Sequence, residues 1–235
     1  MDEKRTAKKR LILFVSLTII IAWGVFLLIP ICGLTYESSV SIVILTAAMF
    51  VPALCNILTR VITKEGFKDM YLRPYFKGHI KLYLLVFFGP MVLLLLSSVV
   101  YFLIFSGSFD PSLSVLKESA SGPVGLSAST FLLIQILGFV VIGPIINIIP
   151  TMGEELGWRG YLLPKLRMFL SDRAALIVSG SIWGVWHLPI IVMGHNYGTD
   201  YAGYPWLGIL AMIVFCVVLG VIEGYLSIKL NSAIP

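Results

Sequence analysis

Two glutamates, an arginine and a histidine interrupt two neighbouring apolar stretches of the sequence: Glu154, Glu155, Arg159 and His187. A charged side chain at the centre of a bilayer costs at least about 2.5 kcal/mol on insertion scales, and such residues usually mark a functional site. A carboxylate that acts as a general base, beside a histidine that helps to hold the same water or a metal ion, can activate that water against a peptide carbonyl. These residue types therefore indicate peptide hydrolysis as the candidate chemistry.

The spacing of the first three residues separates the roles of the two glutamates. On a helix, Glu155 and Arg159 lie four residues apart on one face, in the order that favours an ion pair. Glu154 is rotated by about 100° from its neighbour. We therefore expect one carboxylate to pair with the arginine while that of Glu154 points elsewhere, towards a reactive centre. The alternative is a structural ion-pair network that caps a helix in a transporter or a scaffold.

The histidine belongs to a second apolar segment, Ser-Ile-Trp-Gly-Val-Trp-His-Leu-Pro at residues 181–189. Trp183 and His187 are four residues apart and share a helix face, and we expect the histidine near the middle of a span. Taken alone, such a residue would more often be a hydrogen-bonded interhelical histidine. Two glutamates and one histidine could hold zinc or only hydrogen-bond a water. Glu154 and His187 are the candidate ligands if a divalent metal such as zinc is used.

The composition places these residues in a membrane protein. Of the 235 residues, 58% are hydrophobic and 12% are charged, and the mean hydropathy is +0.97, which is far from the usual soluble balance. Basic residues gather at 4–10 and again at 60–81. In a membrane protein such clusters mark cytoplasmic loops and contacts with anionic headgroups. The net charge of +5 therefore indicates the lipid bilayer as a partner and not nucleic acid.

The elements that carry the site follow from the length of a membrane span. A helix needs about 20 apolar residues to cross a bilayer, and six stretches meet this requirement: 11–33, 38–61, 80–105, 128–150, 173–194 and 205–228. A seventh helix, 153–170, is mixed in character and is expected to be half-buried. Pro144, Pro150 and Gly153 should break the chain just before it. The predicted fold is an all-α, multi-pass transmembrane helix bundle that forms a single membrane domain, 1–235.

Basic residues also give the orientation. The amino terminus, the loop 60–81 and the segment 165–173 are expected in the cytoplasm, and the loops 106–127 and 195–205 outside it. The protein is thus predicted to be a multi-pass protein of the cell membrane with a cytoplasmic amino terminus. The long first apolar run is interpreted as an uncleaved span and not as a signal peptide.

Other polar and thiol-bearing residues have ordinary interpretations. His79 and His195 lie in loops and are expected to be solvated and away from the site. Glu223 and Asn147 lie in or near spans, where helix packing is the default role, although Asn147 could hydrogen-bond near the site. No metal-binding spacing joins the cysteines, so three buried free thiols are expected: Cys32, Cys55 and Cys216.

The charged segment resembles a known family. Glu154, Glu155 and Arg159 match the motif Glu-Glu-x-x-x-Arg, inside the longer family-like string 153–165, and Trp183 and His187 match its aromatic–histidine motif, with Trp where Phe is commoner. These motifs are similar to those of the type II CAAX prenyl endopeptidases and their bacterial relatives, the Abi or CPBP family of membrane proteases. The resemblance implies that Glu154 and His187 activate the attacking water, while the other two charged residues support the site.

The resemblance covers residues 128–235, the family-like catalytic region. A third family motif, His-x-x-x-Asn on a final membrane helix, is thought to stabilise the oxyanion, and the sequence does not contain it. The last residues, 224–235, resemble the segment that leads into that helix, so we expect a chain truncated before it. Losing one oxyanion donor typically lowers the rate about 100- to 1000-fold.

Two functions of different classes follow. The first is an endopeptidase, metalloprotease-like, that hydrolyses a membrane-associated peptide or lipidated protein, with Trp158 and Trp183 as candidate substrate contacts. The family name indicates prenylated substrates, whereas bacterial relatives are linked to peptide export or bacteriocin immunity. The second is a non-catalytic immunity or scaffold protein of the same fold. A transporter is disfavoured because no inverted repeat is visible.

Overall fold

The computed structural model describes residues 2–112, 114, 117–118 and 127–233. Within these residues the regular elements are helices and no strand occurs, which confirms the predicted all-α, multi-pass architecture. The predicted outer loop 106–127 and the end of the family-like region lie partly outside the described residues. Contacts divide the chain into two compact units, Met1–Tyr75 with Ile149–Pro235, and Phe76–Ile148.

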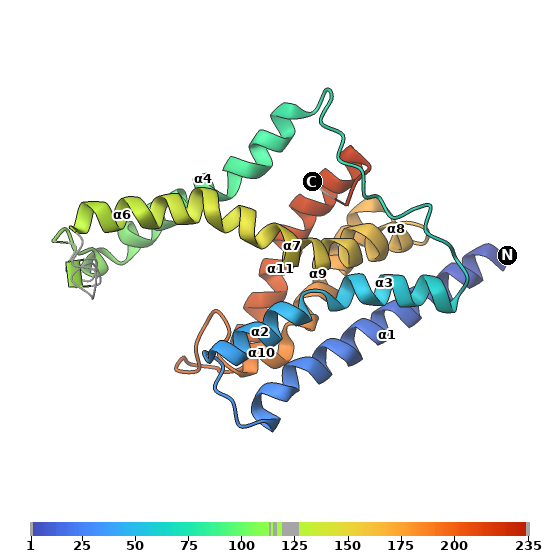
Figure 1. Ribbon diagram of the computed structural model, residues 1–235, viewed down its shortest axis with the longest axis horizontal. Coiled ribbons are helices and arrows are strands. Elements are labelled where there is room, and N and C mark those ends of the chain that lie inside the picture. The colour runs from blue at the N-terminus through green and yellow to red at the C-terminus, as the bar shows by residue number, and fades with distance from the viewer. Residues whose placement is uncertain (1, 113, 115–116, 119–126, 234–235) are drawn as a thin grey trace. The chain divides into compact units, whose positions relative to one another are not determined.

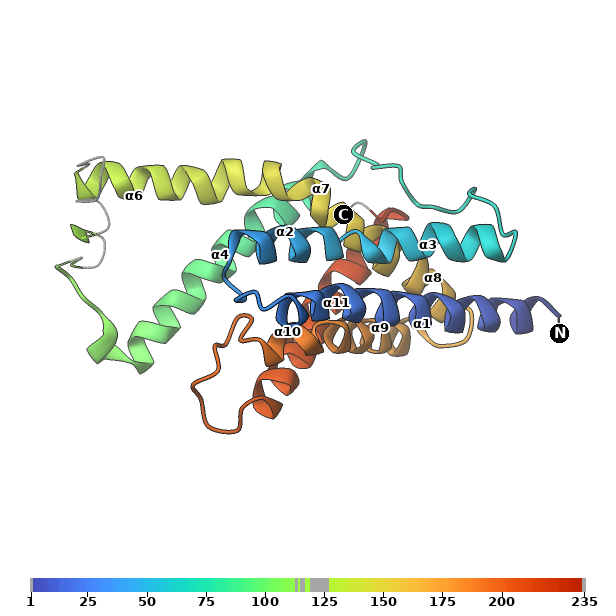
Figure 2. The same cartoon turned by 60° about the horizontal axis from the view of Figure 1, so that its bottom comes forward.

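The first unit contains the candidate site. Its helices are α1 (Asp2–Ile31), α2 (Ser39–Ala48), α3 (Val51–Ile62), the end of α7 (Gly143–Gly157), the π-helical turn η3 (Trp158–Leu162), α8 (Leu163–Leu166), α9 (Asp172–Trp186), α10 (Leu188–Val192) and α11 (Trp206–Leu230). Figures 1 and 2 both show α1 running alongside α3, and α9 packs along α11. The aromatic centre of this unit joins α1 to the site helices: Phe14, Phe26, Trp158, Tyr161 and Trp186.

In the residues that the structure describes, five helical runs are long and apolar enough to cross a membrane, against six predicted spans. The predicted span 173–194 is wrong because α9 has only 15 residues and ends in a turn at His187. The histidine is thus a helix cap at the α9–α10 junction and not a mid-span residue.

The predicted break near residue 150 is also absent. Helix α7 continues through Pro150, so the span 128–150 and the helix 153–170 join in one helical run, Ser129–Leu166. Prolines are tolerated in membrane helices where local adjustment satisfies the freed backbone groups. Two π-helical turns interrupt the run instead, η2 (Gly138–Ile142) and η3, and such turns often occur at functional sites.

Glycines bring α9 and α11 together at backbone distance. A Cβ atom placed on Gly180 would lie 2.6 Å from the Cα of Val217, and one placed on Gly184 would lie 2.6 Å from the Cα of Ile213. Small residues at a helix interface permit such close approach in membranes. This packing brings the polar residues of the two helices next to one another.

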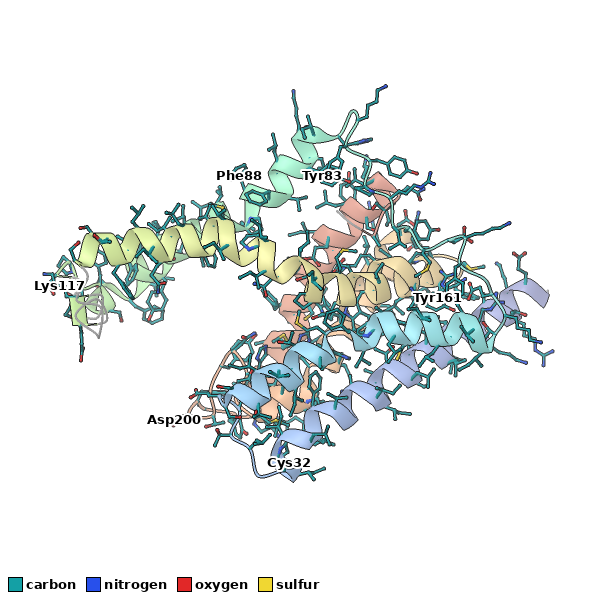
Figure 3. All side chains as sticks on the ribbon, viewed as in Figure 1. Cys32, Tyr83, Phe88, Lys117, Tyr161 and Asp200 are labelled. Atoms are coloured by element: carbon teal, nitrogen blue, oxygen red, sulfur yellow. The ribbon has the colours of Figure 1, made fainter. Side chains whose placement is uncertain are left out.

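The second unit is different in character. Its elements are α4 (Ile80–Ile104), the 3₁₀ turn η1 (Ser106–Ser108), α6 (Ala128–Leu137) and η2. Helix α4 has no buried residue, and Phe88, labelled in Figure 3, is 48% exposed. A helix that is apolar all round is typical of a membrane span.

The cysteines are free thiols, as predicted, but they are not all buried. Cys55 and Cys216 are buried, whereas Cys32 is exposed. It lies in the turn just after α1, close to the end of that helix in Figure 3. The apolar run was therefore a poor guide to its burial, since the residue falls past the end of the helix.

Candidate active site

Glu154 is held by two tryptophans. The residue is 7% exposed on α7, and its Oε2 accepts hydrogen bonds from Trp183 Nε1 at 2.8 Å and Trp158 Nε1 at 3.3 Å. Both bonds end on the same oxygen. Within the described residues no hydrogen bond reaches Oε1, which remains available to accept a proton from a water molecule.

Arg159 lies at the centre of the charged residues. It is 3% exposed, and its Nη1 donates to Glu155 Oε1 at 2.7 Å, which confirms the predicted ion pair. Its Nη2 pairs with Glu223 of α11, and the guanidinium lies over the Trp183 ring, 4.6 Å from the centroid. The arginine therefore connects η3 to both α9 and α11.

Close packing against α3 positions the segment that carries the motif. A Cβ atom on Gly153 would lie 2.7 Å from Met49 O, and one on Gly157 would lie 2.2 Å from Pro52 Cβ. Asn56 Nδ2 of α3 donates to Leu156 O at 2.8 Å, and thereby satisfies a carbonyl next to the π turn. These two glycines and Asn56 thus fix the position of the glutamate-bearing segment relative to α3.

His187 ends α9 with a defined ring orientation. Its Nδ1 lies 2.9 Å from Trp183 O. Because a carbonyl oxygen can only accept, Nδ1 carries the proton, and Nε2 of the neutral ring has the free lone pair. Glu154 and His187 both contact Trp183, but no hydrogen bond joins the two within the described chain. A water or another bridging species is needed to connect them.

The position predicted for His195 is wrong. Its ring stacks on His187, with centroids 6.2 Å apart and an interplanar angle of 12°, and its Nδ1 is hydrogen-bonded to Tyr36 Oη. Backbone bonds from its own N to Ile190 O and within the next turn fold the loop back over α10. A left-handed glycine, Gly194 with φ +96°, permits this turn. His79 is exposed, as predicted.

The charged groups are unevenly balanced. The guanidinium of Arg159 pairs with two carboxylates, those of Glu155 and Glu223, while the carboxylate of Glu154 is bound by the two indoles. The second oxygen of Glu155 is buried without a partner among the described residues. Buried polar atoms are rarely left unpaired, so this oxygen is an unsatisfied acceptor of the site. Asn147, considered from the sequence, is exposed and donates to Gly143 O at 2.8 Å.

Among the described residues, the fold brings no third candidate metal ligand to Glu154 and His187. In the described part of the chain, no group of three or more histidine, cysteine, aspartate or glutamate side chains is arranged to hold a metal ion. Glu154 and His187 stay the two predicted ligands, and a metal held by them would need further donors.

Comparison with known proteins supports the resemblance drawn from the motifs. Residues 128–235 match the family model described as "Type II CAAX prenyl endopeptidase Rce1-like". The predicted family resemblance is thus confirmed for this region. Its range includes both glutamates, Arg159, His187 and also Glu223. Helix packing was the role predicted for Glu223, whereas the structure pairs it with Arg159, 64 residues away in the sequence.

A curated relative extends the likeness. The chain is 29% identical over 147 residues to CAAX prenyl protease 2 of Methanococcus maripaludis, which covers 62% of this chain and 49% of the relative. The chain thus spans about half the length of that relative. No solved structure matches it.

Proposed function

We propose that the protein is an integral membrane endopeptidase in which Glu154 and His187 activate a water molecule. The observation that carries the proposal is the carboxylate of Glu154, which two indole N–H groups hold by one oxygen while the other has no partner in the described part of the chain. A fixed, partly free carboxylate has the geometry of a general base. The match of this region to the CAAX prenyl endopeptidase family supports the same chemistry.

The reaction would proceed by proton transfer and addition. Glu154 takes a proton from the water, whose oxygen forms a bond to the peptide carbonyl carbon. His187 accepts the remaining water hydrogen at Nε2 and so orients the oxygen. When the tetrahedral intermediate collapses, the carbon–nitrogen bond breaks and the proton on Glu154 passes to the leaving amine. Glu155 and Arg159 support the site through their ion pair.

The substrate would be a peptide at the membrane. The curated relative is named for prenyl substrates, so a prenylated peptide with a carboxy-terminal CaaX sequence is the first candidate. Trp183 is only partly buried and can contact such a chain, whereas Trp158 is 0% exposed and would act mainly through its bond to Glu154. If a metal is used, Glu154 and His187 would be its first two ligands.

The protein would lie in the cell membrane with its amino terminus in the cytoplasm. Three predicted cytoplasmic segments supply Arg10, Glu65 and Lys165, and Glu65 forms ion pairs with both cations. Their contact requires the three segments to lie on one side of the bilayer, and the positive-inside rule favours the cytoplasmic side.

Glu154→Gln in the full-length gene product tests the proposal. Reconstituted protein is mixed with a farnesylated, internally quenched CaaX peptide, and cleavage is followed by fluorescence. Because the amide cannot accept the proton, we expect a loss of at least about 100-fold, while thermal unfolding is unchanged. His187→Ala should cause a similar loss.

The exposed Glu37, changed to Gln, is the control and should retain full activity. Unchanged turnover in Glu154→Gln would overturn the proposal. It would favour the non-catalytic alternative, an immunity or scaffold protein of the same fold.

A further inference from the structure

Glu223 is an acid of the site region that neither family motif contains. It lies on α11, with a side chain 28% exposed, and its Oε2 pairs with Arg159 Nη2. The rest of the helix is strongly apolar, and an ionisable residue in such a helix usually has a functional partner. The ion pair to Arg159 supplies that partner.

The surrounding helices are shaped to permit this contact. Gly220 lies one turn before Glu223, and a Cβ atom there would be 3.8 Å from Arg159 Nη2 and 3.3 Å from Gly180 Cα. The two glycines let α9 and α11 approach and leave space for the guanidinium between them. A larger residue at either position would separate the acid from the arginine.

Glu223 is connected to Glu154 through two intermediate side chains. The guanidinium of Arg159, which Glu223 holds, lies over the Trp183 ring, and the indole N–H of Trp183 donates to Glu154 Oε2 at 2.8 Å. A cation over the ring face is attracted to it and so favours this plane of the indole. The plane of the indole in turn sets the direction of its N–H.

The indole of Trp183 makes the connection between Arg159 and Glu154 possible. The family resemblance expects phenylalanine more often here, and a phenyl ring has no N–H to donate. In this chain the ring therefore does two things at once, because its face receives Arg159 and its edge donates to Glu154. The departure from the family pattern couples the two charged groups.

We propose that Glu223 is a positioning residue that orients Glu154 through Arg159 and Trp183. The inference rests on the proposed function of Glu154 as the base. Loss of the Glu223 carboxylate frees one side of the guanidinium, which then competes for Glu154 and moves the indole. The base is misdirected, although the substrate still binds.

Steady-state cleavage of the farnesylated CaaX peptide by the reconstituted full-length protein tests the coupling. We expect Glu223→Gln to lower kcat about tenfold with KM unchanged, and Glu223→Asp to recover part of that loss. Trp183→Phe should lower kcat as well. The double variant should lose no more than the worse single variant, because both changes break one connection. Glu37→Gln is the matched control for replacing an exposed glutamate.

A second readout does not depend on catalysis. The indole N–H resonance of Trp183, assigned by its loss in Trp183→Phe, should shift in Glu223→Gln and stay in place in Glu37→Gln. An unshifted resonance, or fully additive losses in the double variant, would overturn the inference. Activity retained in Glu154→Gln would instead overturn the proposed function, and the shift of the indole resonance would still decide whether the connection exists.

Discussion

Two charged clusters each include residues of the helical run Ser129–Leu166 and differ in how their charges are compensated. The site cluster consists of Glu154, Glu155, Arg159 and Glu223, and the end cluster consists of Arg10, Glu65, Tyr161 and Lys165. The π turn η3 contributes a residue to each, Arg159 to the first and Tyr161, labelled in Figure 3, to the second. Neighbouring positions of one turn thus serve two different environments.

The end cluster is saturated. Glu65 accepts from Tyr161 Oη at 2.8 Å, pairs with Lys165, and lies 3.5 Å from Arg10 Nε. One acid therefore meets two cations and a phenol. Arg10 also donates to the side chain and the carbonyl of Thr63. A cavity of about 360 Å³ lies beside the cluster, so water can reach its side chains.

The site cluster is not saturated. Two of its three acids share one cation, Glu154 has no cation as a partner among the described residues, and one buried oxygen of Glu155 has no partner there either. A saturated cluster contributes to folding and has no free group with which to react. An unsaturated one keeps a carboxylate available, and that is the property a general base requires. Both clusters are charged. The candidate site therefore differs from a structural ion pair in the balance between its acids and its cations, more than in the presence of charge.

Replacing the central arginine should show this difference most strongly. Arg159→Ala leaves buried carboxylates without their cation, and breaking a buried pair in this way typically costs about 3–5 kcal/mol. We expect little folded protein in detergent, measured by the yield of monodisperse material and by thermal unfolding. Arg10→Ala removes a partly exposed cation and should cost about 1 kcal/mol or less. Equal losses in the two variants would contradict the comparison.

Separating α9 from α11 should disrupt the site cluster and leave the end cluster intact. A Cβ atom in Gly184→Ala would lie 2.6 Å from Ile213 Cα, and such overpacking costs about 1–3 kcal/mol. We expect a lower unfolding temperature and a loss of cleavage. Gly24→Ala on α1 is the control, because nothing lies within 4 Å of its added Cβ atom. A destabilised Gly24→Ala would show that the effect is not one of packing.

The smallest expected effect is the dependence of folding stability on pH that Glu65 causes. Burial alone would raise the pKa of Glu65, but the hydrogen bonds from Lys165 and Tyr161 and the charges of Lys165 and Arg10 outweigh burial, so the pKa is lowered from 4.5. The ionised carboxylate therefore stabilises the fold above about pH 4.5, and this contribution is lost as the pH falls through the lowered pKa.

Glu65→Gln tests this pH dependence. We expect the variant to be less stable by about 1 kcal/mol at pH 7, and the difference from the unchanged protein should shrink well below pH 4.5. Thermal unfolding at pH 7, 5 and 3.5 measures it. A difference that grows as the pH falls would show that the carboxylate is not stabilised by its partners.

Hydropathy predicted the long apolar helices well and the irregular ones poorly. The predicted spans 80–105 and 205–228 differ from α4 and α11 by at most two residues at either end. The segment 173–194 and the break at Pro150 were wrong, because an average over apolar residues cannot detect a cap at His187 or a proline accommodated within a helix.

The local part of the site could be read from residue spacing. The pair of Glu155 and Arg159 follows from one helical turn. The indole bond from Trp183 to Glu154 and the pairing of Arg159 with Glu223 could not be predicted, since they join helices that lie far apart in the sequence. The stacking of His195 on His187 likewise depends on a turn that folds a loop back.

The sequence by itself determined that the chain is a helical membrane protein, that its charged motif resembles a protease family, and that one glutamate pairs with one arginine. These features depend on composition and on contacts within one turn, which are local in the chain. Only the tertiary structure decided which oxygen of Glu154 is held, that Glu223 completes the arginine's pairing, and which charged cluster is saturated. Those outcomes depend on contacts between helices that are far apart in the sequence. The pairing of Glu223 depends on how closely α9 approaches α11, and glycines at their interface permit that approach.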